Sequence, residues 1–306
     1  MITWNDSYEM GIASFDEEHR QLFRISEQIL EMLRAREHED TARMFVIREG
    51  LNYLEGYFAQ HAAQEEAYMR AIGYEGYALH KMLHDDFQKN QMAKYQRIAA
   101  SGMCSREDAW DFVGSGIGWL LEHIATADMA IVGKGILCRP EAWQADLSTL
   151  EREVNQLLTA TLNIETNAKV VSDQYAGEPI GKMVCQRFVY RWGGLGITVI
   201  SGIERSFLLD VAKSLYGSGV EDEMDLILST LETFSASFWL TLSRQMTGSQ
   251  EKIELRESGF LMTSALPEEL RTLEPTLSLL FTSDKGKFFV ATNSKAMGQL
   301  LMKQTA

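Results

Sequence analysis

The stretches His61-Ala-Ala-Gln-Glu65 and His80-Lys-Met-Leu-His84 decide how the first part of this 306-residue chain folds. Each contains two side chains that can bind a metal, four residues apart, and that spacing places both on one face of an α-helix. Imidazole and carboxylate groups together suit first-row transition metals, iron among them. The two stretches therefore predict two helices that direct metal ligands at a common point.

Three further side chains of the same kinds extend this pattern. His19 precedes the two stretches, and His123-Ile-Ala-Thr-Ala-Asp128 follows them, whereas the sixth histidine, His38, lies in a charged stretch. Any one of these histidines could equally be a surface or capping residue. Together, however, they lie among apolar residues, where unpaired imidazoles and carboxylates are costly to bury. We therefore expect four helices to aim seven ligands at one metal site. The seven are His19, His61, Glu65, His80, His84, His123 and Asp128.

Apolar residues recur at helical spacing up to about residue 128, as in the stripe Leu22, Ile25, Ile29 and Leu33. Such stripes predict a helical core. Gly114-Ser-Gly-Ile-Gly118 imitates part of a dinucleotide fingerprint, but no predicted strand precedes it. Because glycine in a helix interior costs about 1 kcal/mol relative to alanine, this segment indicates either close helix packing or a soft helix near the metal.

Residues 1–133 resemble a bacterial hemerythrin, a non-haem di-iron protein that binds O2 in an up-down four-helix bundle. Besides the seven ligands, the likeness rests on Trp4, Tyr8-Glu-Met-Gly-Ile12, Asp16-Glu-Glu-His19, Tyr57 and Met69. It implies two iron ions joined by an oxo or hydroxo bridge. It also implies a division of the ligands: His80, His84 and His123 on one iron, His19 and His61 on the other, with Glu65 and Asp128 bridging. The iron with two histidines would keep a coordination position open for O2.

The chemistry of the ligand set agrees with O2 binding. Ferritin-like di-iron sites use mostly glutamate, whereas this set is rich in imidazole and poor in carboxylate. Fewer anionic ligands should stabilise ferrous iron and so favour O2 binding over full oxidative turnover. The same ligands accept manganese or zinc as well as iron, and metal availability decides among them.

Ala62 departs from the family, in which a phenylalanine commonly follows the histidine of the second helix. One hypothesis is a larger or wetter ligand pocket, with faster autoxidation or room for a ligand other than O2. The alternative is that Tyr68 or another aromatic residue fills the gap.

Composition and charge exclude several other classes of protein. A net charge of −14 argues against nucleic-acid binding, which needs a basic surface. The three cysteines, Cys104, Cys138 and Cys185, are scattered and odd in number, so we expect no disulfide framework. The first 18 residues lack the apolar segment of a signal peptide, and no run approaches the roughly 20 apolar residues of a membrane helix. We expect a cytoplasmic protein without membrane contact.

Residues 134–173 are expected to join two domains. Gly133-Lys-Gly135 and Cys138-Arg-Pro140 indicate a helix end, and a stripe from Trp143 to Ile164 predicts a helix from about 141 to 173. This connecting helix could transmit movement from the bundle, form a dimer contact, or cap the second domain.

Residues 174–306 predict an α+β domain. Met183 to Tyr190 and Leu195 to Ile200 are rich in β-branched and aromatic residues, which is typical of strands. Helices are expected at 204–216, 221–245 and 295–301, and further strands near 252–255, 276–282 and 287–291, with Ser283-Asp-Lys-Gly286 as a hairpin turn. From about residue 160 to 304 this order resembles the chemotaxis phosphatase family of CheX.

Active members of that family carry Glu-x-x-Asn on the long helix, where the glutamate binds a receiver lysine and the asparagine positions water. Here the matching residues are Glu232 and Ser235. A serine hydroxyl cannot reproduce the reach and the two-sided hydrogen bonding of an amide, so strong phosphatase activity is not expected. Glu232 and Ser235 are candidates for a docking patch, and the alternative is that Glu232 is a solvated helix residue.

The favoured interpretation is a cytoplasmic O2 or redox sensor, with a CheX-like domain that passes the signal on in chemotaxis or two-component signalling. Its expected partners are O2, a response-regulator receiver domain or another chemotaxis protein, and a second copy of the chain through the second domain or the connecting helix. The alternatives are enzymes: a di-iron peroxide or nitric oxide reductase, or an O2-regulated phosphatase.

Overall fold

The structure is a computed structural model that describes residues 2, 4–134, 146–192, 194–247 and 253–302. The chain divides into two compact units. The first unit comprises Met1–Cys138 and Asp222–Thr233, and the second comprises Arg139–Glu221 and Phe234–Ala306. Within the described ranges, no helix is both long and apolar enough to cross a membrane.

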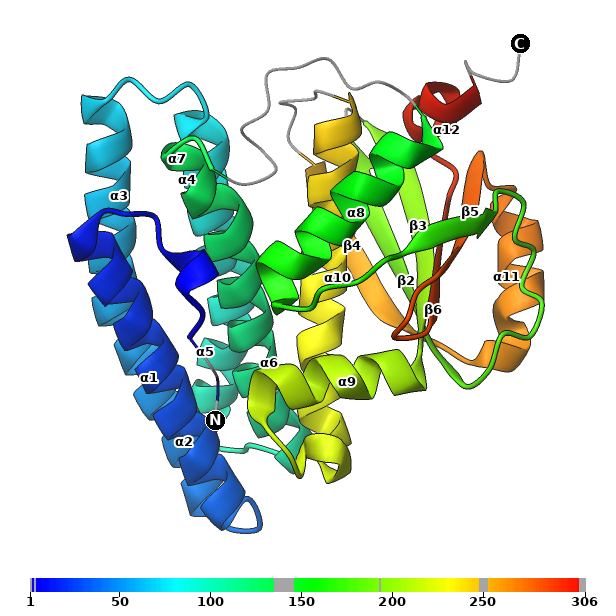
Figure 1. The fold of residues 1–306 in the computed structure, drawn as a ribbon. Coiled ribbons are helices and arrows are strands. Elements are labelled where there is room, and N and C mark those ends of the chain that lie inside the picture. Colours follow the sequence, from blue (N-terminus) through cyan, green and yellow to red (C-terminus); the bar gives the residue numbers. More distant parts are fainter. Residues whose placement is uncertain (1, 3, 135–145, 193, 248–252, 303–306) are drawn as a thin grey trace. The chain divides into compact units, whose positions relative to one another are not determined.

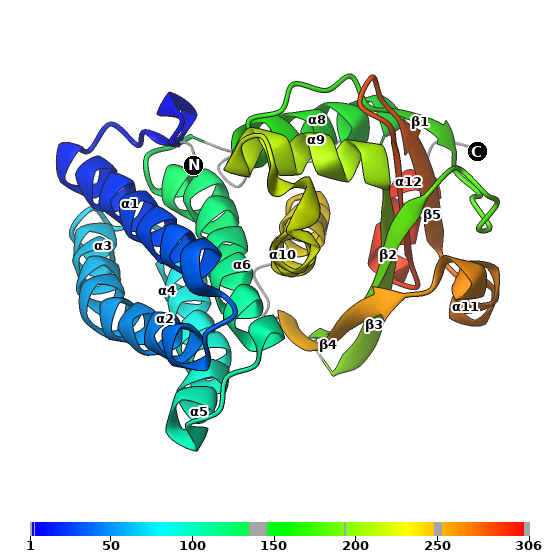
Figure 2. The ribbon, with the colours of Figure 1, turned by 90° about the horizontal axis from the view of Figure 1, so that it is seen from below.

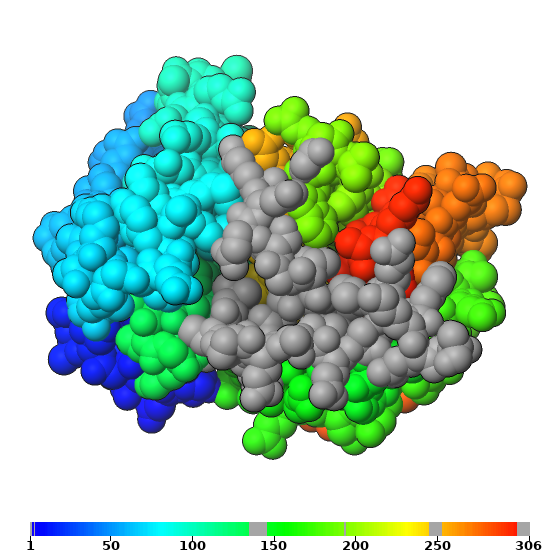
Figure 3. Space-filling view, turned by 90° about the horizontal axis from the view of Figure 1, so that it is seen from above, coloured from blue at the N-terminus to red at the C-terminus, as the bar shows by residue number. Residues whose placement is uncertain are grey.

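Four long helical segments form a bundle in the described part of the first unit, which confirms the predicted all-helical domain (Figure 1). In three of them, one wider π-helical turn lies between two stretches of α-helix, and the chain continues through it without a break. The segments are α1 (Ala13–Arg36); α2 (Asp40–Tyr53), η2 (Leu54–Phe58) and α3 (Ala59–Ala71); α4 (Tyr77–Asp86), η3 (Phe87–Met92) and α5 (Ala93–Ser101); and α6 (Arg106–His123), η4 (Ile124–Asp128) and α7 (Met129–Ile131). The end of the bundle where α3 meets α4 faces the viewer in Figure 3.

Local hydrogen bonds fix where these helices begin and end. The Ser105 side chain accepts a hydrogen bond from the backbone of Asp108, and the Asp108 side chain accepts one from the backbone of Ser105, which forms a capping box at the start of α6. Such caps stabilise a helix by about 1 kcal/mol. Gly102 ends α5 with φ of 71°, a left-handed conformation that glycine adopts without strain.

An antiparallel sheet forms the centre of the second unit, as predicted for an α+β domain. Its order in the described residues is β1-β5-β6-β3-β2-β4. The strands are β1 (Lys169–Ser172), β2 (Met183–Trp192), β3 (Leu195–Glu204), β4 (Ile253–Leu261), β5 (Leu277–Thr282) and β6 (Lys287–Thr292). The helices of this unit are α8 (Leu147–Leu162), α9 (Arg205–Tyr216), α11 (Leu266–Leu273), α12 (Lys295–Met302) and the second half of α10 (Met224–Thr247).

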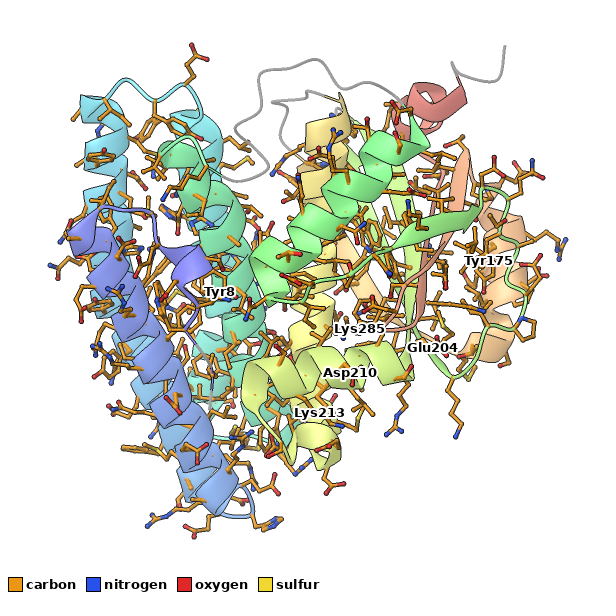
Figure 4. The ribbon with its side chains drawn as sticks, viewed as in Figure 1. Tyr8, Tyr175, Glu204, Asp210, Lys213 and Lys285 are labelled. Carbon is orange, nitrogen blue, oxygen red and sulfur yellow. The ribbon has the colours of Figure 1, made fainter. Side chains whose placement is uncertain are left out.

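Other elements pack on both faces of the sheet, to which successive side chains of a strand point alternately. Phe289 and Ala291 of β6 pack with Leu266 and Leu270 of α11 and with Tyr175, which is labelled in Figure 4. The second half of α10 lies on the other face, inside the curve of the sheet (Figure 2). There the Tyr190 hydroxyl donates a 2.8 Å hydrogen bond to the carbonyl oxygen of Ala236.

The connecting helix is shorter than predicted. The described helix α8 ends at Leu162, and Asn163 follows it in the left-handed conformation. The Asn155 side chain then accepts hydrogen bonds from Thr166 Oγ1 and Ala168 N, which tie the next segment back onto α8. The prediction of helix as far as residue 173 was therefore wrong, because β1 begins at Lys169. Trp143, Gly135 and Cys138 lie outside the described residues.

Candidate metal centre

The structure brings together all seven side chains that the sequence singled out. His19 lies on α1, His61 and Glu65 on α3, His80 and His84 on α4, His123 at the end of α6 and Asp128 at the end of η4. None of the seven is more than 3% exposed. They form two groups in which every potential ligand atom lies within 4.8 Å of the others, and both groups contain Glu65 and Asp128.

Three histidines converge in the first group. The Nε2 atoms of His80 and His84 are 3.2 Å apart, and those of His84 and His123 are 3.1 Å apart. Asp128 Oδ1 lies 3.0 Å from His123 Nε2, and Glu65 Oε2 lies 3.4 Å from His84 Nε2. Three imidazole nitrogens thus face one small volume, with a carboxylate oxygen from each of two further residues beside them.

The second group uses the other oxygen of each carboxylate. Asp128 Oδ2 lies 3.2 Å from His19 Nε2, and Glu65 Oε1 lies 3.6 Å from His61 Nε2. Glu65 and Asp128 therefore each present one oxygen to the three-histidine group and one to the two-histidine group. This is the arrangement by which two carboxylates can bridge a pair of cations.

The donor atoms fit metal ions better than they fit one another. In the described residues, both oxygens of Glu65 and both oxygens of Asp128 are buried without a hydrogen-bond partner. An ionised carboxylate buried in this way carries a penalty of several kcal/mol. Cations held between these oxygens and the facing imidazoles would remove that penalty, so the residues present suit a metal centre.

The electrostatics of the protein without metal agree with this interpretation. Burial alone would lower the pKa of His19, but its interactions with the nearby carboxylates of Asp128 and Glu65 outweigh burial and raise the pKa to about 10. Burial would raise the pKa of Glu65 and of Asp128, yet the surrounding histidines hold both well below their ordinary values. The two carboxylates thus stay ionised and attract positive charge. Because ligands must lose their protons to bind a metal, uptake of a cation would release protons from this cluster.

The turn η4 explains how Asp128 reaches the site from the same helix as His123. In an α-helix, side chains five residues apart point about 140° away from each other. The π-helical turn Ile124–Asp128 contains one residue more than an α-helical turn and brings the two side chains back to one face. No motif or spacing in the chain marks this widening. Such turns are common at functional sites.

Two glutamates next to ligand residues were not assigned a role from the sequence. His61 Nδ1 donates a 2.7 Å hydrogen bond to Glu18 Oε2, which leaves Nε2 of the same ring facing Glu65. Glu66 Oε1 lies 3.5 Å from His84 Nδ1. A partner on the second ring nitrogen fixes the orientation and the tautomer of a histidine ligand. Glu18 and His61 lie on different helices, so no short sequence spacing connects them.

Aromatic rings enclose both groups of histidines. Trp119 stacks on His123 with ring centroids 4.3 Å apart, and Phe58 meets the edge of His84. On the two-histidine side, Phe15 of α1 meets both His61 and Tyr68 edge-on. An aromatic ring thus stands beside His61 although Ala62, itself buried, follows that histidine. Whether Ala62 enlarges the ligand pocket stays a prediction.

Glu232 and Ser235 both lie on α10, but Glu232 belongs to the first unit and Ser235 to the second. Glu232 is half-buried and Ser235 is only 8% exposed. Their role as a docking patch stays a prediction. Of the cysteines, Cys104 and Cys185 are free and buried.

Comparison with known proteins places residues 10–134 in the family described as hemerythrin HHE cation binding domain. The bacteriohemerythrin of Clostridium acetobutylicum is 32% identical over 129 residues, which are 42% of this chain and 96% of that protein. The hemerythrin of Themiste dyscrita is 31% identical over 132 residues, or 43% of this chain and 91% of that protein. The bacteriohemerythrin of Stenotrophomonas maltophilia is 30% identical over 132 residues, covering 42% and 78%.

Among solved structures, a putative chemotaxis protein from Desulfovibrio vulgaris Hildenborough aligns with 44% of this chain and 86% of its own. The sequence identity is 10% and the TM-score is 0.28. So low a score supports no argument about fold or function, and the CheX-like interpretation of the second unit stays a hypothesis.

Proposed function

Because this chain belongs to the hemerythrin family through residues 10–134, we propose that its first unit holds two iron ions and binds O2 reversibly. His80, His84 and His123 would hold one ion, and His19 and His61 the other. Glu65 and Asp128 would each contribute one oxygen to both. Iron at this site would supply the redox chemistry by which O2 is bound.

The observation that carries this proposal is the division of the two carboxylates. Each directs one oxygen at the three-histidine group and the other at the two-histidine group. A single-ion site would not need two separate groups of imidazoles on opposite sides of the same carboxylates. The asymmetry of three histidines against two is what would leave room for an exogenous ligand beside His19 and His61.

The remaining residues control access and orientation. Phe58 and Trp119 close the three-histidine side with apolar surface, which keeps water from those imidazoles. Glu18 holds a proton on His61 Nδ1 and so presents Nε2 as the ligand atom. On the two-histidine side, Phe15 is the ring that would border bound O2.

We further propose that the chain is a cytoplasmic sensor, in which the ligand state of the first unit alters what the second unit binds. A fused α+β unit has no evident use if the bundle only stores O2. A receiver domain of a response regulator or another chemotaxis protein is the proposed partner, and a second copy of the chain is the other candidate.

The first experiment is optical. Iron-loaded protein is reduced without air, O2 is admitted, and the visible spectrum is followed before and after the gas is removed. A new charge-transfer band that appears with O2 and disappears on degassing supports reversible binding. Direct and irreversible passage to the ferric form would refute O2 carriage and favour a redox sensor or a reductase. Iron analysis on the same sample should give two ions per chain, and one ion would refute the bridging assignment.

A further inference from the structure

Helix α10 contributes residues to both units of the chain. It is one helix from Met224 to Thr247, yet the division falls between Thr233 and Phe234. Its first part packs with the bundle as an additional helix of the first unit, and its second part packs on the sheet of the second unit. Because an unbroken helix is stiff, a displacement of its first part should also displace its second part.

Within the first unit, α10 meets α6 at a glycine. A Cβ atom added at Gly114 would lie 2.8 Å from Ser229 Cβ and 3.0 Å from both the carbonyl oxygen of Leu226 and the amide nitrogen of Thr230. Real Cβ atoms do not come that close to other atoms. The two helix backbones therefore touch at Gly114, which confirms close helix packing as the explanation for this residue. By contrast, a Cβ atom added at Gly116 would have no neighbouring atom within 4 Å.

A polar cluster fixes the register of this contact. The Ser229 hydroxyl donates a 2.7 Å hydrogen bond to Asp111 Oδ1, and the Tyr95 hydroxyl donates one of 2.8 Å to Asp111 Oδ2. Lys94 forms an ion pair with the same carboxylate. Asp111 of α6 thus joins α5 to the first part of α10, and a shift of α10 along α6 would break its bond to Ser229.

Two ion pairs hold the start of α10 to the bundle. Arg34 of α1 donates to both carboxylate oxygens of Glu223, over 2.7 Å and 2.8 Å. Arg106 pairs with Asp225 and also donates a hydrogen bond to Glu37, the residue that follows the end of α1. The bidentate pair with Glu223 is partly buried, and such pairs give geometric specificity as well as attraction. The first part of α10 is therefore attached to α1 and α6 by packing and by charge.

From this arrangement we propose that α10 is the element that couples the metal centre to the second unit. α6 ends at His123, and η4 continues it to Asp128, so two of the seven proposed ligands belong to the helix that carries Gly114. Nine residues, about 14 Å of helix, separate Gly114 from His123. If α6 can adopt two placements, a ligand that binds more tightly to one of them shifts the equilibrium toward it. Because α10 packs on α6, it would move with that shift. This inference rests on the proposed function and assigns coupling to α10 in place of the helix expected at 141–173.

The test compares Gly114→Ala with Gly116→Ala in the full chain. Both replace a glycine in the interior of α6, so both raise the intrinsic helix propensity of that segment to the same extent. Only the alanine at position 114 forces α10 away. Amide hydrogen exchange of the described part of α10 is measured in reduced iron-loaded protein with and without O2. In the wild type and in Gly116→Ala, O2 should change the exchange rates of residues 234–247 by about fivefold or more, the lower end of typical allosteric coupling.

In Gly114→Ala that response should disappear from residues 234–247, although the O2-dependent spectrum persists. Loss of the response in both variants, or its survival in Gly114→Ala, would overturn the proposal. If Gly114→Ala does not fold, Ser229→Ala removes the bond to Asp111 without added bulk and should weaken the response. The spectrum recorded on the same samples tests O2 binding separately. Should O2 not bind reversibly, comparison of the reduced and oxidised iron forms gives the same two outcomes for α10.

Discussion

Glu18 offers a sharp test of the two-histidine half of the centre. Its carboxylate accepts a 2.7 Å hydrogen bond from His61 Nδ1, and the side chains of His61 and Glu18 are 3% and 20% exposed. Glu18→Ala removes the acceptor and leaves the imidazole free to turn or to change tautomer. Loss of an outer partner of a histidine ligand costs about 10-fold to 100-fold in metal affinity. Since water can reach the exposed fifth of the Glu18 site, we expect a loss of about 5-fold to 30-fold, or about 1–2 kcal/mol.

The loss should fall on one ion of the two. Glu18 touches only the two-histidine group, whereas His84 of the other group has Glu66 beside its Nδ1. Competition with a chromophoric chelator, without air and with ferrous iron, resolves the two binding steps. Glu18→Gln keeps an acceptor oxygen and should recover most of the affinity. Glu17→Ala is the matched control, because Glu17 is 61% exposed and pairs with Arg24 on the surface.

Equal affinity of Glu18→Ala and Glu17→Ala for both ions would refute the reasoning. So would an equal loss at both binding steps, because that result would mean that Glu18 acts through the stability of the bundle. Thermal unfolding of the metal-free variants separates the two causes.

Two further predictions concern other parts of the first unit. Ala62→Phe should slow the oxidation of the reduced protein by air about tenfold if the added ring excludes water from His61, a change of about 1.4 kcal/mol in the barrier; an unchanged rate would show that Phe15 already closes that side. Burial would raise the pKa of Asp111, but hydrogen bonds from Lys94 and Ser229 outweigh burial and lower the pKa. The stability that Asp111 contributes is therefore fully present above the pKa of this group in the unfolded chain, about 3.8. It is lost as the pH falls through the lower pKa of the folded protein. Asp111→Asn should therefore lower the free energy of unfolding by about 1–3 kcal/mol at neutral pH, with a gap to the wild type that closes below about pH 4 in denaturant titrations, and a constant gap would contradict the assignment.

The sequence predicted those parts of the site whose geometry follows from helical spacing. His61 with Glu65 and His80 with His84 are four residues apart, and an unmodified α-helix is enough to place each pair on one face. Asp128 was predicted by residue type and by family resemblance, but its approach to His123 depends on a wide turn that leaves no mark in the sequence. Glu18 could not be found, because its partner His61 is remote in the chain and only the packing of α1 on α3 brings them together.

In the second unit, most of the helices and strands were predicted from their composition and spacing, β2, β3 and α10 among them, and so was the short helix α12. Two elements were missed. β1 has only four residues, which is too short for a periodic pattern, and α11 was not recognised as a helix although it is as long as α12. The apolar stripe of the connecting segment runs on to Ile164, and the left-handed turn at Asn163 overrides it. The division of α10 between two units has no counterpart in the sequence either, since its apolar spacing continues across Thr233 without a break.

The wide turn η4 also bears on how the length of this helix can vary. Loss of one residue between Ile124 and Ala127 would convert the turn to ordinary α-helix, with its full set of i→i+4 hydrogen bonds. Histidine and aspartate would then be four residues apart and would still share a face. Single-residue deletions should thus be tolerated at this point, whereas one between His61 and Glu65 would turn the carboxylate away from its histidine. Proteins with a centre of the same geometry need not share the spacing found here.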